Sequence, residues 1–517
     1  MKKFLTSFLL LLLPLGLLPQ NPVVMTDHGL VEGSLGENKI LSFKGIPFAA
    51  PPVGSLRWKP PLPAASWEGI KHCVSYGPSP VQAKPAPFMF WSSEFLIPES
   101  PISEDCLYLN VWTKELAPEK KKPVLVYIYG GGFRSGGAGC PIYDGTSMAK
   151  KDVVFVNFNY RVGLFGFLAH PGLSAESPEH TSGNYALQDM IAALKWVRDN
   201  IAAFGGDPQN VTIAGQSAGA FAVNYLTVSP LAHGLFQKAI AESGGNFYTA
   251  ANRRIQGLKL AERSGTELAK SLNCSSVAEL RALPAGTILQ ANGGTTWPIV
   301  DGYVIPSGIY KAYAQGEQAA VPLIVGWNAD DRVFADAGKS PSEFEKALKD
   351  RFGDLAPSFL SVYPHSTLEK VRESQRKMSR DETFAVQGYA WAEFQSNLSG
   401  SDVFVYNFNR KLPANDKSSA FGAFHSGEIV YAYGNLSTLN RPWEPVDYEI
   451  SNKMSDYWAN FARYGNPNAP GLPKWQPFDS DSRNAMIIDN QMKSAELPDL
   501  EQLNLWESYF RKSLDNE

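Results

Sequence analysis

Short apolar runs alternate with longer amphipathic segments through the middle of the chain. Runs rich in β-forming residues occupy 124–129, 153–159, 211–214, 238–241, 323–326 and 403–408. Between 184 and 204, apolar residues recur three and four positions apart, which is typical of one helix face, and 218–227 reads as a second helix. This alternation predicts an α/β protein with a large, mostly parallel sheet covered by helices on both faces. Ligands of such sheets bind at the carboxyl ends of the strands.

The chain shows no repeat, no low-complexity tract and no linker that would separate two domains. Its composition is ordinary for a globular protein, with 517 residues of which 44% are hydrophobic and 19% charged. The formal net charge of −4 gives no reason to expect a nucleic-acid partner. We therefore expect a single domain over residues 21–517.

The first 20 residues have the pattern of an export signal. Lys2 and Lys3 precede an apolar run over 4–18 that Pro14 interrupts. The run is shorter than the roughly 20 residues that span a bilayer, so we expect a signal peptide at 1–20 and no stable membrane anchor. An uncleaved interfacial anchor is the alternative. The expected location is secreted or periplasmic.

One motif indicates nucleophilic catalysis. Gly215-Gln216-Ser217-Ala218-Gly219 matches G-x-S-x-G directly after the strand at 211–214 and at the start of a helix. In that setting the strained turn presents a serine hydroxyl above the sheet. A lone match of this kind is weak, but its position between a strand and a helix favours Ser217 as a nucleophile.

A serine nucleophile needs donors for the oxyanion that forms on the substrate carbonyl. Gly130-Gly131-Gly132 follows the strand at 124–129, and glycines leave backbone N–H groups unobstructed. Ala218 follows the nucleophile at a helix N-terminus and supplies a further donor. A flexible glycine turn is the alternative interpretation of the triplet alone.

The base and the acid are sought downstream of the serine, in the order serine, acid, histidine. Among the seven histidines only His365 and His425 lie far enough along the chain, and the small-residue loop around His425 favours it over His365. For the acid, Asp330 and Asp331 both follow the strand at 323–326. Asp301 is a competitor better explained as a turn residue.

Further segments carry a family resemblance that runs from about Gly29 to about Phe478. They are 45–49 (GIPFA), 52–57 (PVGSLR), 103–111 (SEDCLYLNV), 129–133 (YGGGF), 159–163 (NYRVG), 204–208 (FGGDP) leading to the G-x-S-x-G motif, and the His425 loop. Together they resemble the type-B carboxylesterase and cholinesterase family.

The resemblance implies the α/β-hydrolase fold with lid insertions over an active-site gorge. It implies Ser217 as nucleophile, His425 as base, and Gly131, Gly132 and Ala218 as oxyanion donors. The family's acid is usually the glutamate of a Gly-x-Asn-x-Asp-Glu-Gly segment, and Asp331 stands at that position. No metal and no cofactor are implied.

The resemblance also implies scaffold features. A disulfide would join Cys73 to Cys106 and close an aromatic and proline-rich lid segment, while we expect Cys140 and Cys274 to be free thiols. Two structural ion pairs would form, Arg57 with Glu104 and Arg161 with Asp189.

Two departures from the family pattern bear on the substrate. Gln216 replaces the glutamate that usually precedes the serine, and Leu96 replaces the tryptophan with which cholinesterases bind quaternary ammonium. We expect a serine carboxylesterase that hydrolyses small-molecule esters other than choline esters. A lipase or sterol-ester hydrolase and a non-catalytic adhesion protein are the alternatives. The sequence leaves the preferred ester and the oligomeric state open.

Overall fold

The computed structural model describes residues 21–36, 38–99, 101–248, 256–333, 338–398, 401–414 and 421–514. The signal peptide expected at residues 1–20 lies outside them. Within these ranges, none of the helices combines the length and the apolar character needed to cross a bilayer.

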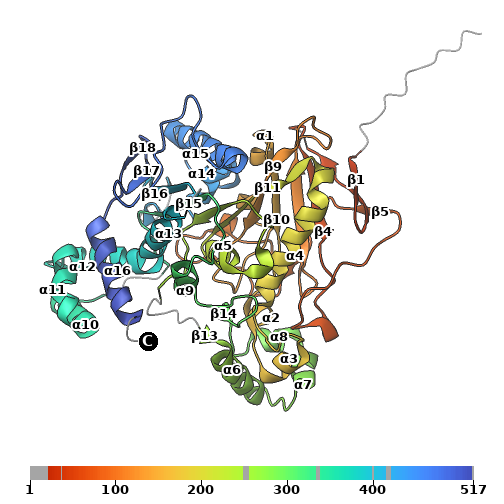
Figure 1. Ribbon diagram of the computed structural model, residues 1–517, viewed down its shortest axis with the longest axis horizontal. Coiled ribbons are helices and arrows are strands. Elements are labelled where there is room, and N and C mark those ends of the chain that lie inside the picture. Colours follow the sequence, from red (N-terminus) through yellow and green to blue (C-terminus); the bar gives the residue numbers. More distant parts are fainter. Residues whose placement is uncertain are drawn as a thin grey trace, which may run out of the picture.

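An 11-stranded mixed sheet forms the centre of the molecule (Figure 1), in the order β18-β17-β16-β15-β12-β11-β9-β10-β8-β4-β3. From β10 to β17 neighbouring strands run parallel, and the strands at both edges pair antiparallel. The strands are β3 (Ser34–Leu35), β4 (Leu41–Pro47), β8 (Tyr108–Thr113), β9 (Lys122–Ile128), β10 (Val154–Phe158), β11 (Gly206–Gln216), β12 (Lys238–Glu242), β15 (Leu323–Asn328), β16 (Val403–Phe408), β17 (Asn484–Ile488) and β18 (Lys493–Glu496). The sheet confirms the predicted fold class.

Three small sheets flank the central one. They comprise β1 (Val23–Thr26), β2 (Gly29–Glu32) and β5 (Ile70–His72); β6 (Ser79–Pro80) and β7 (Ile102–Ser103); and β13 (Gln256–Gly257) and β14 (Ile299–Val300).

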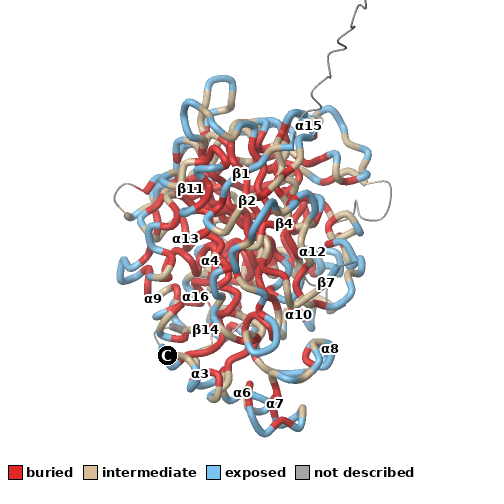
Figure 2. The backbone as a smooth tube through the Cα atoms, turned by 90° about the vertical axis from the view of Figure 1, so that its right-hand side faces the viewer, coloured by how far each residue is buried: buried red, intermediate tan, exposed pale blue. Residues whose placement is uncertain are grey.

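Helices cover both faces of the central sheet. The helices α4 (Tyr185–Asn200) and α5 (Ala218–Val228) pack together on β11, α13 (Val386–Ser396) packs on β15 and β16, and α15 (Pro445–Tyr464) packs on β9 and β11 from the other face (Figure 1). The remaining helices are α1 (Thr146–Lys150), α2 (Gly163–Phe167), α3 (Pro171–Glu176), α6 (Leu258–Ser271), α7 (Val277–Ala282), α8 (Ala285–Leu289), α9 (Ile309–Ala314), α10 (Pro341–Phe352), α11 (Ala356–Val362), α12 (Leu368–Arg380), α14 (Ile429–Ala432) and α16 (Leu500–Leu514). Figure 2 shows the buried residues concentrated in the sheet and the exposed ones on outlying helices such as α6 and α8.

The six predicted strands correspond to β9, β10, β11, β12, β15 and β16, but two boundaries differ. Strand β11 begins at Gly206, because its register against β9 shifts between Gly206 and Val211 and leaves a polar stretch inside the strand. The helix predicted over 184–204 ends at Asn200 and continues as a 3-10 turn, which Gly205 ends in the left-handed region at φ +84°.

Both expected ion pairs are formed. Arg161 donates through Nη2 and Nε to Asp189 at 2.6 and 2.8 Å, with both side chains at most 3% exposed. Arg57 donates to both carboxylate oxygens of Glu104. Arg161 also donates to the carbonyl of Lys59, so the pair joins β10, α4 and an N-terminal loop.

The disulfide expected between Cys73 and Cys106 is not formed, because all four cysteines are buried free thiols. Cys73 Sγ lies 4.0 Å from the carbonyl oxygen of Gly45. Cys106 instead faces the small cavity beside Arg161. The two thiols therefore have different surroundings, and the free state expected for Cys140 and Cys274 extends to this pair.

Replacing Asp189 by asparagine should destabilise the protein markedly, because the Arg161 guanidinium would remain buried without a counter-charge. Breaking a buried pair in this way costs about 3–5 kcal/mol. Thermal unfolding should show a large fall in the unfolding midpoint for D189N. The exposed pair of Lys346 and Asp350 provides the control, and K346Q should shift the midpoint little. Equal shifts in the two variants would contradict this account.

Candidate active site

Ser217 lies on a strained turn between β11 and α5. Its backbone has φ +54°, and its N–H donates to the carbonyl of Glu242 at the end of β12 at 2.9 Å. A Cβ at Gly219 would lie 1.9 Å from the carbonyl oxygen of Ile128, so only glycine permits the helix to approach β9 this closely. The turn leaves Ser217 partly exposed on the wall of a cavity.

The glycine triplet lies against this turn. A Cβ at Gly130 would lie 3.0 Å from that of Ser217, Gly131 has φ +116°, and Gly132 has φ +61° with open space where its Cβ would be. Among the loop backbone hydrogen bonds in the described part of the chain, none uses the N–H groups of Gly131, Gly132 or Ala218. Three backbone donors are thus available beside the serine.

His425 and Asp331 are in direct contact. The ring nitrogen Nδ1 of His425 lies 2.5 Å from Oδ1 of Asp331, and both side chains are at most 1% exposed. This contact fits the tautomer in which Nδ1 carries the hydrogen and Nε2 accepts. The aromatic ring of Phe384 stacks on the imidazole at 4.6 Å between ring centres, so the ring plane is fixed from two sides.

The loops that carry these two residues are themselves paired. Strands β15 and β16 run parallel, and a further parallel bridge joins Asp330 to Phe424 beyond their ends. Asn328 Nδ2 donates to the carbonyl of Phe424 at 2.8 Å. The pairing holds Asp331 and His425 in register at the carboxyl edge of the sheet.

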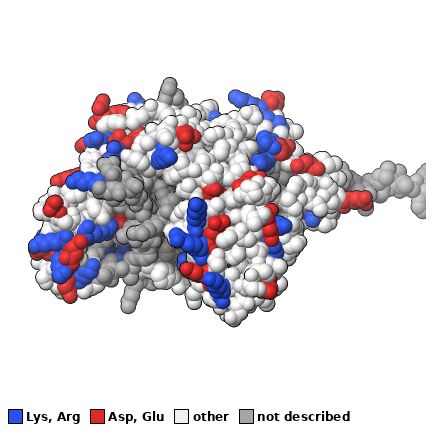
Figure 3. Space-filling view, turned by 60° about the horizontal axis from the view of Figure 1, so that its bottom comes forward, with Lys and Arg blue, Asp and Glu red and all other residues white. Residues whose placement is uncertain are grey.

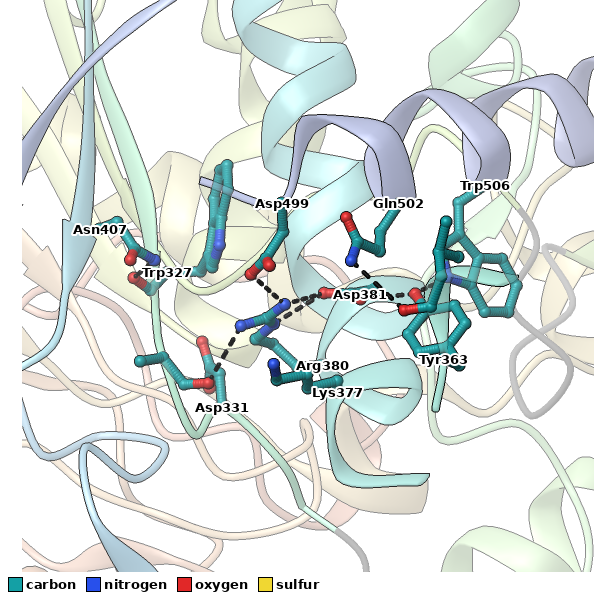
Figure 4. Close-up of polar contacts among 12 residues, drawn as sticks. Trp327, Asp331, Tyr363, Lys377, Arg380, Asp381, Asn407, Asp499, Gln502 and Trp506 are labelled. Atoms are coloured by element: carbon teal, nitrogen blue, oxygen red, sulfur yellow. Dashed lines mark hydrogen bonds and ion pairs between the residues drawn. The ribbon is translucent and has the colours of Figure 1, made fainter. Parts of the chain in front are cut away.

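A buried network of charged side chains supports the loop that carries Asp331 (Figure 4). Arg380 donates to the carbonyl of Ala329 at 3.2 Å and to the carboxylates of Asp381 and Asp499 at 2.7 Å each. Asp381 also accepts from the hydroxyl of Tyr363 at 2.6 Å. Asp331 Oδ2 accepts from the backbone N–H of Asn328, so both of its oxygens are engaged.

The structure separates the candidates that the sequence left open. Asp330 Oδ2 accepts from the backbone N–H of Ala423 at 2.9 Å rather than from the imidazole. Asp301 accepts from the backbone of Tyr303 and Ile305 as a turn residue. His365 contacts the carbonyl of Tyr363 outside this site.

The third contact of the site involves Gln216. Within the described residues no hydrogen bond joins the Ser217 hydroxyl to His425; instead Nε2 of Gln216 lies 3.3 Å from Nε2 of His425. The hydroxyl of Ser426 donates to Oε1 of Gln216 at 3.2 Å, and Trp91 Nε1 donates to that hydroxyl at 3.3 Å. The glutamine side chain therefore bridges the serine turn and the histidine loop.

Ser217, His425 and the glycine triplet line one cavity of about 960 Å³. The segment between Cys73 and Cys106 supplies an aromatic part of its wall, with Phe88, Trp91, Phe95 and Leu96. Trp91 lies edge-on to the His425 ring at 6.0 Å between centres. A cavity of this size, with both apolar and polar side chains in its wall, suits a small organic molecule.

Two buried carboxyl groups beneath the site were missed by the sequence reasoning. Glu242 is fully buried; its Oε1 accepts from Trp458 Nε1 at 2.7 Å and from the Tyr433 hydroxyl at 3.2 Å. Burial raises its pKa to about 8. Glu428 is also fully buried, and burial, with the nearby Asp331 carboxylate, raises its pKa well above the ordinary range. A glutamate that ends an apolar strand, as Glu242 does, was the available signal.

Replacing Glu242 by glutamine should flatten the pH dependence of stability. Between the ordinary pKa of 4.5 and the folded value of about 8, the folded protein keeps a proton that the unfolded chain has released. The free energy of unfolding therefore falls as pH rises through that window, by up to about 1.4 kcal/mol per unit. Glutamine keeps the acceptor oxygen but cannot ionise.

Unfolding midpoints measured from pH 5 to pH 8 would test this. The midpoint of E242Q should fall less with rising pH than that of the wild-type protein. The exposed Glu267 on α6 supplies the control, and E267Q should keep the wild-type dependence. An unchanged slope in E242Q would count against a protonated Glu242.

Comparison with known proteins agrees with this architecture. A family profile described as the carboxylesterase family matches residues 20–506. The chain is 35% identical over 496 residues to the fumonisin B1 esterase of Sphingopyxis macrogoltabida, covering 91% of this chain and 87% of that protein. It is 34% identical to the para-nitrobenzyl esterase of Bacillus subtilis (strain 168), covering 93% and 97% respectively.

Solved structures show the same relationship. A structure titled PNB esterase superposes with a TM-score of 0.80 at 31% identity and covers 95% of this chain and 99% of that one. A thermophilic PNB esterase gives the same TM-score, also at 31% identity, covering 94% and 100%. The resemblance inferred from the sequence is confirmed, and the chain belongs to the carboxylesterase family of carboxylic ester hydrolases with the α/β-hydrolase fold.

Proposed function

We propose that this protein hydrolyses small-molecule carboxylic esters through a covalent acyl-enzyme on Ser217, with His425 as general base and Asp331 as the acid that orients it. The observation that carries the proposal is the 2.5 Å contact between His425 and Asp331 on the cavity that exposes Ser217. A histidine held by a buried carboxylate beside a strained serine is the arrangement that activates a hydroxyl nucleophile.

The first step is acylation. His425 Nε2 takes the hydroxyl proton as Ser217 Oγ attacks the ester carbonyl carbon, and the carbonyl oxygen becomes an oxyanion that accepts hydrogen bonds from Gly131, Gly132 and Ala218. The imidazolium then gives the proton to the alkoxy oxygen, the C–O bond breaks, and the alcohol leaves. Asp331 stabilises the imidazolium without taking its proton.

The second step reverses these roles with water. His425 Nε2 takes a proton from water as the water oxygen attacks the acyl carbon. The tetrahedral intermediate collapses, Ser217 recovers its proton from the imidazolium, and the carboxylic acid is released. In the unliganded protein Gln216 lies against Nε2, so its amide has to yield that position to Ser217 before attack. Catalytic hydrogen bonds often tighten only in the substrate complex.

We also propose that residues 1–20 direct export and that the protein acts outside the cytoplasm. The charged start, the short apolar run and the break at Pro14 support this. Mass spectrometry of the protein recovered from culture medium or periplasm should find a mature chain without this segment.

Replacing Ser217 by alanine should abolish ester hydrolysis, because alanine has no nucleophilic oxygen. We expect kcat for 4-nitrophenyl acetate to fall by about 10⁴-fold or more. The wild-type protein should gain one covalent adduct from an organophosphate, and S217A should gain none, as measured by intact mass. Hydrolysis by S217A at the wild-type rate would remove Ser217 from the mechanism.

Asp331 and Asp330 form a matched pair for a second test. D331N removes the charge that holds the imidazolium and should lower kcat by about 10³- to 10⁴-fold. D330N changes a neighbouring carboxylate that accepts only from the Ala423 backbone among its described hydrogen bonds, so its effect should be far smaller. Steady-state kinetics on the same ester would compare them, and a larger loss in D330N would reverse the assignment.

A further inference from the structure

The charged side chains on the described part of the cavity wall are basic. The described residues that line the cavity include Lys84 and Arg134 but no aspartate or glutamate. This is not a consequence of overall composition, because acidic residues outnumber basic ones by 51 to 47 in the chain. Gln216, beside the nucleophile, adds no negative charge. On the face shown in Figure 3, Lys and Arg side chains are interspersed with Asp and Glu, so the surplus of basic groups is a property of the cavity lining and not of the surface.

Arg134 is the one arginine among the described lining residues, and its side chain is exposed. It follows Gly132 by two residues, and its backbone N–H donates to the carbonyl of Gly131 at 3.0 Å. Its Nε donates to the Thr296 hydroxyl at 3.1 Å on the opposite part of the wall. No carboxylate of the described residues pairs with its guanidinium, which leaves the other N–H groups open to a ligand.

Lys84 contributes less positive charge to the cavity than Arg134 does. Its ammonium pairs with the carboxylate of Glu99 at 3.3 Å, and both side chains are more than 70% exposed. A solvated pair of this kind has little net charge to offer an anion. Among the described lining residues, Arg134 is therefore the side chain whose positive charge is not offset by a carboxylate partner.

The residue before Thr296 carries a buried hydroxyl that has no hydrogen-bond partner among the described residues. Thr295 lines the cavity next to Thr296 and is 5% exposed, and its Oγ1 makes no hydrogen bond within the described residues. Buried hydroxyls are normally hydrogen-bonded. The aromatic side chains of Trp91, Phe221 and Trp297 also line the cavity and would contact the apolar remainder of an ester held by Arg134.

We propose that this site prefers esters that carry a free carboxylate, and that Arg134 is the specificity-determining residue. The inference rests on the proposed ester hydrolysis and names its substrate class. Arginine suits this role because its planar guanidinium binds a carboxylate through two parallel N–H groups.

The experiment uses the full-length enzyme and esters that differ only in charge. The acyl-side pair is the mono-4-nitrophenyl ester of adipic acid and its terminal carboxamide. The alcohol-side pair is 4-carboxyphenyl acetate and 4-carbamoylphenyl acetate. Rates are first corrected for spontaneous hydrolysis. In each pair, kcat/KM for the charged ester is then divided by kcat/KM for the neutral carboxamide-bearing ester, so a general change in activity cancels.

We expect the wild-type ratio to exceed one in the pair that places its carboxylate at Arg134, by about 10- to 100-fold if the charged hydrogen bonds are formed. R134Q should bring that ratio close to one, and R134K should keep part of it because it retains the charge. Arg198, paired with Asp199 on the surface of α4, supplies the control, and R198Q should keep the wild-type ratio. Added salt should lower the wild-type ratio and leave that of R134Q unchanged.

The outcomes separate this inference from the function on which it rests. One outcome is that the wild-type protein hydrolyses the neutral carboxamide-bearing esters, that S217A loses this activity, and that the charged-to-neutral ratios are near one in both pairs. That result would overturn the carboxylate preference but leave the proposed ester hydrolysis intact. A wild-type ratio that R134Q leaves intact would overturn the role of Arg134. Failure to hydrolyse any of the four esters would count against the proposed function itself.

Discussion

The contact between Asp331 and His425 is the interaction on which the candidate active site depends. Asp331 and His425 lie 94 positions apart in the sequence, yet an isolated parallel bridge between Asp330, just after β15, and Phe424, in the loop after β16, brings their side chains into contact. Neither residue is part of a strand, since β15 ends at Asn328 and β16 at Phe408, so this bridge and the hydrogen bond from Asn328 to the Phe424 carbonyl set their relative position. Pairing between two loops at the carboxyl edge of the sheet thus holds the two side chains together.

The serine turn depends on close packing in a comparable way. Glycines at 215 and 219 allow β11, α5 and β9 to approach within distances that any side chain would obstruct. The positive φ of Ser217 is unfavourable for a residue with a Cβ, and the hydrogen bond from its N–H to Glu242 helps to hold it. Strain at the nucleophile is therefore balanced by the packing of three elements around it.

Much of the fold and of the candidate site could be predicted from the sequence, because both leave local signals. Six apolar runs marked six of the central strands, and the G-x-S-x-G motif marked the serine turn. Other features leave no local signal. The start of β11 lies in a polar stretch at the register shift, so the apolar pattern does not mark it. The disulfide implied by the family resemblance is not formed. The stacking of Phe384 on His425 and the contact of Gln216 with the imidazole arise from residues brought together only by the tertiary fold.

The wall segment between Cys73 and Cys106 has a consequence for how the cavity is maintained. No covalent cross-link closes that loop, so its position depends on the packing of Phe90 and Phe95 against Phe424, the residue that precedes the histidine. The shape of this part of the cavity wall is thereby tied to the loop that carries His425. A displacement of either segment would therefore change the position of the other.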